Sequence, residues 1–125
     1  NGDGKLDLAV VSSPDTTKGV VRVFLNGGNG TFSHADFPAG PEPNAVTMAD
    51  LDGNGTLDLA IASYWGVSVL LNNGKGGFKQ RVEYGTGGRP VWVAAGDLDG
   101  DGRIDLVTAN YFDSTLSLLM NRCLP

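Results

Sequence analysis

The sequence predicts an all-β protein built from repeated units, and three observations support this prediction. Nineteen of the 125 residues are glycine, which is typical of a chain with many tight turns. Short apolar segments alternate with clusters of Gly, Asn and Asp, as they do when strands are joined by hairpins. A loop rich in aspartate and glycine recurs at nearly constant spacing, which indicates stacked units.

The recurring loop has the pattern D-x-D-G-x-G-x-x-D, in which Asn can replace the third or fifth residue. Residues 97–105 read DLDGDGRID, residues 50–58 read DLDGNGTLD, and residues 1–7 match positions three to nine. The ninth residue of the pattern is Asp7, Asp58 and Asp105 in the three copies, which gives spacings of 51 and 47 residues. We therefore expect one domain over residues 1–125 with units at about 1–40, 41–87 and 88–125.

Each complete unit is predicted to contain four short strands joined by hairpins, with the acidic loop before the second strand. The expected strands lie at residues 8–11, 20–25 and 31–37 in the first unit; at 45–49, 59–63, 67–71 and 78–84 in the second; and at 91–95, 106–109 and 115–120 in the third.

The inner strands are apolar on both faces, whereas the outer strands are mixed. Leu59 and Ile61 align with Leu106 and Thr108, and residues 79–83 read KQRVE. A sheet buried on both faces must lie between similar sheets, as the blades of a β-propeller do. We expect about two and a half blades of four antiparallel strands. A parallel β-helix would show a nonapeptide period, which is absent.

The acidic loops are predicted to bind Ca²⁺, because alternating carboxylates offer the six to eight oxygens that this hard cation takes. An EF-hand is disfavoured, since Ile61 and Thr108 stand where its bidentate Glu is required. Any single loop could instead be an ordinary turn. We expect two full sites, a third partial one, and a structural role for the ion. The expected ligands, with position seven acting through its carbonyl oxygen, are Asn1, Asp3, Lys5, Asp7, Asp50, Asp52, Asn54, Thr56, Asp58, Asp97, Asp99, Asp101, Arg103 and Asp105.

Charge and cysteine content narrow the class of protein. The formal charge of −5 arises from 14 acidic and 9 basic residues, and nine of the acidic residues lie in the loops. The absence of a basic stripe argues against nucleic acid as a partner.

No apolar segment of membrane-spanning length is present, so no membrane insertion is expected. Loops of this kind suit millimolar calcium, which favours an extracellular, periplasmic or cell-surface location. Cys123 is predicted to be unpaired or bridged to a partner outside this sequence.

The sequence offers no catalytic constellation, so we expect a protein that is not an enzyme. His34 is the single histidine, and Cys123, near the end of the sequence, is not expected to act as a nucleophile. Recognition has better candidates, because aromatic side chains on exposed loops can stack on sugars or anchor a protein. These candidates, expected at the end of the sheets away from the acidic loops, are Tyr64, Trp65, Tyr111, Phe112 and Arg89. The alternative is that the aromatic rings fill space between neighbouring blades.

Several motifs together resemble FG-GAP or VCBS repeats, the repeats of integrin-α-like propellers. They are the acidic loop, the D-L-A strand after it, the L-N-x-G-x-G-x-F turn at 71–78 with a variant at 25–32, and the G-x-x-P segments at 40–43 and 87–90. The sequence departs from the repeat in three places: the first loop lacks its leading position, no Phe-Gly pair occurs, and the last unit lacks the glycine turn and a fourth strand.

The resemblance implies a propeller with ion loops on one face and ligand binding on the opposite face. It implies a non-catalytic adhesion or recognition module for a glycan or protein; the alternative is an accessory propeller of a secreted polysaccharide lyase or phospholipase. Further blades, or a neighbouring copy, are expected to complete the open edges.

Overall fold

The computed structural model describes residues 1–122, which form ten strands in three antiparallel sheets. The prediction of an all-β chain is confirmed, and no helix occurs in this range, so none is present there that could cross a membrane. Cys123 lies outside the described residues.

The first sheet contains β1 (Leu8–Ser12), β2 (Gly19–Asn26) and β3 (Phe32–Gly40). The middle sheet contains β4 (Ala45–Ala49), β5 (Asp58–Ser63), β6 (Gly66–Leu70) and β7 (Val82–Gly85). The third contains β8 (Pro90–Gly96), β9 (Asp105–Asn110) and β10 (Thr115–Leu119).

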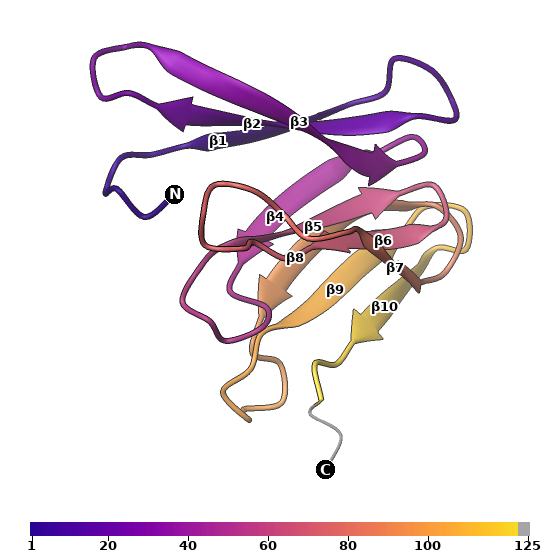
Figure 1. Ribbon diagram of the computed structural model, residues 1–125. Coiled ribbons are helices and arrows are strands. Elements are labelled where there is room, and N and C mark those ends of the chain that lie inside the picture. The colour runs from indigo at the N-terminus through magenta and orange to yellow at the C-terminus, as the bar shows by residue number, and fades with distance from the viewer. Residues whose placement is uncertain (123–125) are drawn as a thin grey trace.

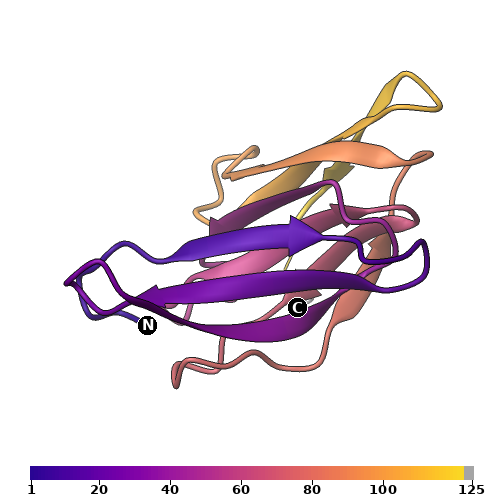
Figure 2. The same cartoon turned by 90° about the horizontal axis from the view of Figure 1, so that it is seen from above.

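The three sheets are stacked in chain order, with the first at the top of Figure 1 and the third at the bottom. Figure 2, seen from above, shows the strands of the first sheet lying over the other two. Within each sheet, consecutive strands are neighbours, so every connection is a hairpin-like loop. The order of four hairpin-linked strands predicted for the second unit is therefore present in the middle sheet.

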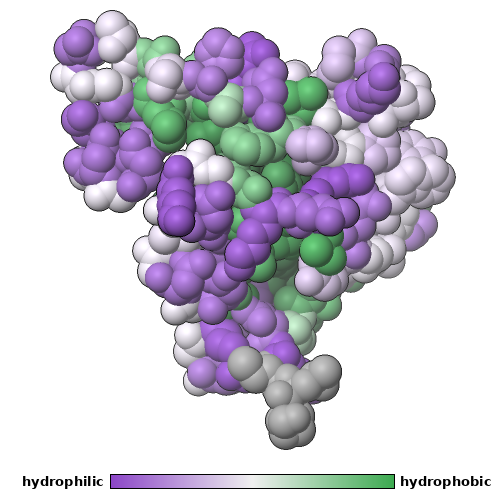
Figure 3. Space-filling model, in the orientation of Figure 1, coloured by the Kyte–Doolittle hydropathy of each residue, from purple (hydrophilic) through white to green (hydrophobic). Residues whose placement is uncertain are grey.

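Two apolar clusters join the middle sheet to its neighbours. On one face, Leu59 and Ile61 of β5 pack with Val21 of the first sheet; on the other, Ala60 and Val67 pack with residues of the third sheet. All residues of β5 and β6 are buried, as the apolar pattern on both faces predicted. Hydrophobic residues accordingly gather across the upper middle of the surface in Figure 3, bordered by hydrophilic ones.

The strand expected at residues 78–84 is shorter than predicted. Phe78 makes only an isolated bridge to Asn72, and β7 begins at Val82. The Phe78 ring instead packs edge-on against Phe37 of the first sheet, with ring centroids 5.0 Å apart. The ring is partly buried between the first and middle sheets, a contact that no local sequence pattern reveals.

The outward surface of the third sheet is apolar and uncovered. We call this surface the outer face of the third sheet, and pairing in the β8–β9–β10 ladder places on it Trp92, Ala94, Val107, Ala109, Leu116 and Leu118. Leu116 is 71% exposed and Trp92 is 64% exposed. The corresponding face of the middle sheet, which contains Ala60 and Val67, is buried.

The outward surface of the first sheet is mixed. Leu8 and Val10 of β1 share this outer face of the first sheet with Arg22 and Asp36, and the last two form a two-pronged ion pair at 2.6 and 2.7 Å. Both apolar side chains are about half exposed. The stack thus ends in two uncovered faces of different composition.

The strands separate two sets of loops. The acidic loops precede β5 and β9 at one end of the sheets, on the left of Figure 1, which we call the loop end. The β5–β6 and β9–β10 hairpins lie at the other end of the same strands, which we call the hairpin end. The predicted ion loops and the predicted aromatic loops therefore lie at opposite ends of the stack.

Candidate metal centres

Two clusters of three carboxylates form at the loop end. Asp50, Asp52 and Asp58 each direct a carboxylate oxygen to within 4.8 Å of the others, and the third unit repeats the arrangement with Asp97, Asp99 and Asp105. The same three positions of the nine-residue pattern, one, three and nine, thus converge in both loops. Like charges brought this close repel one another unless a cation or a proton compensates them.

The first carboxylate of each loop holds the turn that brings the others together. The backbone N–H groups of Asn54 and Gly55 donate to Asp50, at 3.0 and 2.8 Å. In the third unit, those of Gly100 and Gly102 donate to Asp97, at 2.7 and 2.9 Å. Gly55 and Gly102 adopt φ of +83° and +84°, a left-handed conformation in which a side chain would be strained. The glycine at position six of the pattern is therefore required by the backbone in both loops.

The ninth carboxylate is buried and fixed by two backbone donors. Asp58 accepts hydrogen bonds from the N–H of Leu51 at 2.8 Å and of Asn72 at 2.7 Å. Asp105 is held in the same way by Leu98 at 2.9 Å and Asn121 at 2.7 Å. These bonds connect each acidic loop to the residue that follows the third strand of its own unit, so the site includes a second chain segment.

Sequence reasoning missed this second segment. Asn26 is the last residue of β2, and Asn72 and Asn121 lie two residues after β6 and β10. Each donates its side-chain amide to the carbonyl that precedes the ninth aspartate, at Leu6 (3.1 Å), Leu57 (3.0 Å) and Ile104 (3.2 Å) respectively. The L-N pair of the glycine turn, at 25–26 and 71–72, is the available signal, and Met120 stands in place of the leucine in the third unit. Local pattern assigns this pair only to the turn, because the hydrogen bonds span 15 to 20 residues along the chain.

The pKa values of the two ninth carboxyls shift in opposite directions. Burial raises the pKa of the Asp58 carboxyl. This rise outweighs the lowering of the pKa by the hydrogen bonds from the backbone N–H groups of Asn72 and Leu51. The pKa of Asp105 is lowered, chiefly by the backbone donors of Asn121 and Leu98. Asp58 belongs to the sheet that is covered on both sides, which explains the larger cost of its charge. A cation beside Asp58 would offset that cost.

The fifth positions do not join the clusters. The Asn54 side chain accepts hydrogen bonds from the backbone N–H and hydroxyl of Thr56. Asp101 accepts from the backbone N–H of Arg103 and forms an ion pair with its guanidinium. Coordination by these two side chains, and by the carbonyl oxygens of Thr56 and Arg103, stays a prediction.

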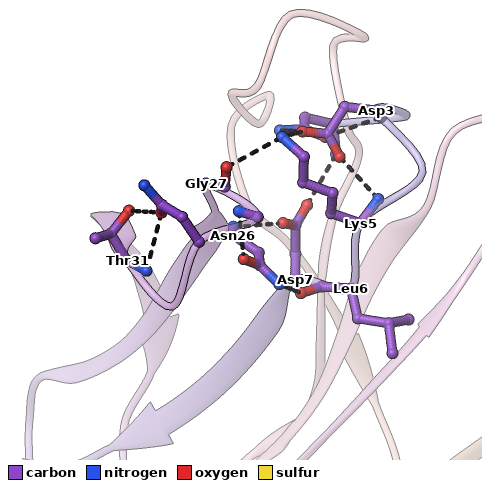
Figure 4. A network of polar contacts seen from close by, with 10 residues as sticks. Asp3, Lys5, Leu6, Asp7, Asn26, Gly27 and Thr31 are labelled. Carbon is purple, nitrogen blue, oxygen red and sulfur yellow. Dashed lines mark hydrogen bonds and ion pairs between the residues drawn. The ribbon is translucent and has the colours of Figure 1, made fainter.

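The first loop differs from the other two, as Figure 4 shows. The Lys5 ammonium lies 3.5 Å from the Asp3 carboxylate and also donates to the carbonyl of Gly27 at 3.3 Å. Asp7 accepts a hydrogen bond from the N–H of Asn26 at 2.8 Å, as its equivalents do. Among residues 1–122, clusters of three acidic side chains occur only in the other two loops. A lysine ammonium thus pairs with one of the predicted carboxylate ligands of the first loop. Ion binding by Asn1, Asp3, Lys5 and Asp7 stays a prediction.

The donor set of the two clusters fits a hard divalent cation. All six side chains supply carboxylate oxygens, which suit Ca²⁺ and Mg²⁺, whereas zinc prefers nitrogen and sulfur ligands. The nearest ammonium, that of Lys79, lies 3.7 Å from Asp52 and is more than half exposed, so it compensates little of the negative charge. Either cluster could therefore hold a metal ion.

The hairpin end brings together all five residues that the sequence predicted for ligand recognition. The Arg89 guanidinium carbon lies 5.9 Å from the ring centroid of Tyr64 and 5.4 Å from that of Phe112, between hairpins of two neighbouring sheets. Trp65 packs edge-on against Tyr64, and Tyr111 lies beside Phe112. We call these five residues the aromatic patch. Trp65 is 70% exposed and Tyr111 is 66% exposed.

The backbone at Arg89 is held in an unusual conformation. Arg89 has φ of +50°, and Glu42, its ion-pair partner at 3.4 Å and the equivalent residue of the preceding unit, has φ of +43°. Left-handed conformations of such side chains cost free energy and persist where the surroundings enforce them. The N–H groups of Tyr111 and Phe112 donate to the carbonyls of Arg89 and Gly88 and secure this turn.

Comparison with protein families agrees with the repeat pattern and the three stacked sheets. Neither a search of curated proteins nor a search of solved structures returned a match. The family model for the FG-GAP-like repeat matches the chain twice, at residues 1–61 and 50–108. The two matches together span residues 1–108, and each includes an acidic loop with its following strand. The chain belongs to the FG-GAP-like repeat family.

Proposed function

We propose that this chain is a calcium-binding, non-catalytic β-propeller module that recognises a glycan or protein outside the cytoplasm. The observation that carries the proposal is the convergence of three carboxylates at the same loop positions in two units. Calcium is favoured over magnesium because irregular loops accommodate its flexible coordination, whereas magnesium demands near-ideal octahedral geometry. Carboxylates that must come together to complete the fold couple ion binding to stability, which makes the role structural.

Isothermal titration with CaCl₂ tests the ion. We expect calcium to bind both loops, and Asp52→Ala and Asp99→Ala each to remove one site, because each substitution deletes one exposed member of a cluster. Glu83→Ala is the matched comparison, since Glu83 is an exposed acidic residue of β7 outside the acidic loops. Absence of any calcium binding at millimolar concentration would contradict the proposed function.

The propeller proposal extends the observed stacking beyond the three sheets. Twice in this chain, a sheet covers the apolar face of the preceding sheet, and the outer face of the third sheet is another surface of the same kind. We propose that it receives the outer face of the first sheet of a second copy. Such a head-to-tail contact repeats an interface already present inside the chain, and it closes into a ring when the rotation allows.

Mixing two monomeric variants tests the head-to-tail contact. Leu118→Glu alters only the outer face of the third sheet and Val10→Glu only that of the first, so we expect each variant alone to sediment as a monomer. Because each keeps one intact face, an equimolar mixture is expected to form heterodimers in analytical ultracentrifugation. Val82→Glu, at an exposed position on the edge strand β7, is the control and should self-associate like the unaltered chain. A wild-type chain that stays monomeric at 100 μM, roughly the upper range of weak specific contacts, would overturn the contact.

The aromatic patch is the proposed ligand surface. An exposed ring next to a guanidinium offers both stacking and a charged hydrogen-bond donor, a combination enriched at binding hot spots. We expect Trp65→Ala to weaken binding to the glycan that a glycan array selects by about tenfold or more, the loss typical of a hot-spot aromatic residue. Phe32 is another exposed aromatic residue, but it pairs with Asn26 at the loop end, so Phe32→Ala should leave binding unchanged. Equal affinity of the two variants would exclude the patch.

A further inference from the structure

A continuous chain of hydrogen bonds joins the two acidic clusters. The N–H of Leu51 donates to Asp58 at 2.8 Å, and the carbonyl of the same Leu51 accepts from the side-chain amide of Asn121 at 2.7 Å. The backbone N–H of Asn121 then donates to Asp105 at 2.7 Å. Two residues, one from each unit, therefore separate the ninth carboxylates of the two loops.

Asn121 is the one asparagine of the three whose preceding unit has a complete acidic loop in this sequence. The side-chain amides of Asn26 and Asn72 donate to the carbonyl that precedes the ninth aspartate of their own unit. Asn121 makes that bond, to Ile104 at 3.2 Å, and adds the bond to Leu51 of the preceding unit. The side chain is partly buried, and Leu51 packs against the apolar cluster between the middle and third sheets. The contact is thus sheltered from solvent and anchored on both sides.

We infer that Asn121 is a positioning residue that couples the two metal sites, so that calcium in one loop raises the affinity of the other. The inference rests on the proposed calcium binding. An ion drawn to Asp58 fixes that carboxylate and, through it, the peptide group of Leu51. The Leu51 carbonyl then fixes Asn121, whose N–H holds Asp105 in the position needed at the second site. A loop that is already ordered loses less conformational entropy on binding, which gives positive cooperativity.

Calcium titrations of matched variants measure the coupling. All proteins carry Asp3→Ala, so that the first loop does not contribute to binding. Asp52→Ala and Asp99→Ala report the affinity of each remaining site alone, and the parent reports the product of the two constants when both sites fill. The ratio of that product to the product of the single-site association constants is the coupling factor. The three titrations are then repeated with Asn121→Ala and with Asn72→Ala.

We expect a coupling factor of about five to ten in the parent and in Asn72→Ala, at the lower end of the range for linked sites. Asn121→Ala is expected to reduce the factor to about one. A purely structural role for Asn121 would change the affinity of the nearby site while leaving the factor above one, and that result would overturn the inference. A factor of one in the parent would also overturn it and leave calcium binding intact, whereas absence of binding at both loops would defeat the proposed function as well.

A second measurement needs no substitution at Asn121, in case that variant does not fold. In Asp99→Ala, where only the loop at 50–58 is expected to fill, calcium should shift the NMR resonances of the Asn121 side-chain amide and slow hydrogen exchange of its backbone N–H. Resonances of Asn26, which donates only within the first unit, serve as the internal reference. Unchanged Asn121 signals at calcium saturation would refute the coupling.

Discussion

Calcium at ten times its dissociation constant is expected to raise the free energy of unfolding by about 1.4 kcal/mol per site, or about 2.8 kcal/mol for two. The effect follows from mass action, because the clusters exist only in the folded chain, where hairpin turns gather the carboxylates. For a domain of this size, the midpoint of thermal unfolding should rise by about 10 °C. Circular dichroism melts in EDTA and in calcium measure the shift.

Two controls separate ion binding from a general effect of salt. Magnesium at the same ionic strength should stabilise the chain much less, because it dehydrates reluctantly and demands octahedral geometry. Asp99→Ala should lose about half of the calcium-dependent shift, since the cluster at residues 50–58 remains. Identical melting curves in EDTA, magnesium and calcium would show that the clusters do not stabilise the fold through an ion.

Asp58→Ala is expected to lower the free energy of unfolding by about 2–4 kcal/mol even in EDTA. The substitution leaves the partly buried N–H groups of Leu51 and Asn72 without their acceptor, and an unpaired buried group costs about 1–3 kcal/mol. Loss of a carboxyl whose pKa is raised by burial offsets part of this cost, because its charge is itself unfavourable. Urea denaturation in EDTA and in calcium measures both the intrinsic loss and the disappearance of one ion site.

Asp58→Asn distinguishes the two roles of this side chain. The amide keeps one oxygen acceptor and nearly the same volume, so we expect a smaller loss of stability in EDTA than for Asp58→Ala. It lacks the negative charge, so the calcium-dependent gain at this site should still be lost. Asp101→Ala, at an exposed position outside the cluster, should unfold in EDTA at nearly the parent's urea concentration. An Asp58→Ala protein as stable as the parent in EDTA would contradict the buried hydrogen-bond role.

Much of the candidate site could be predicted from local pattern. The D-x-D-G-x-G-x-x-D spacing placed Asp50 and Asp52 on a glycine turn and Asp58 at the start of a strand, and the structure brings these three together. The aromatic pairs could be assigned to the hairpin end because a strand carries its two flanking loops to opposite ends. The roles of Asn72 and Asn121 could not be predicted, since their partners lie far away along the chain.

The strand pattern gave a less complete account of packing. Residues 67–71 and 115–120 are similarly apolar, yet β6 is buried on both faces while Leu116 and Leu118 of β10 are mostly exposed. Sequence predicts that an apolar face needs a cover, but it does not specify which surface provides one. Phe78 shows the same limit, since local pattern places it in a strand, whereas in the structure its ring packs against Phe37 of another sheet and β7 begins only at Val82.

The sequence by itself determined the repeat, the all-β architecture, the hairpin order and the acidic turns, because these depend on residues that are neighbours along the chain. Only the tertiary structure decided that a buried ninth carboxylate binds the turn after the third strand, that Arg89 lies between rings of two sheets, and that Asn121 spans two units. Those contacts depend on how the sheets stack, which is set by the fit of whole faces and not by any single segment.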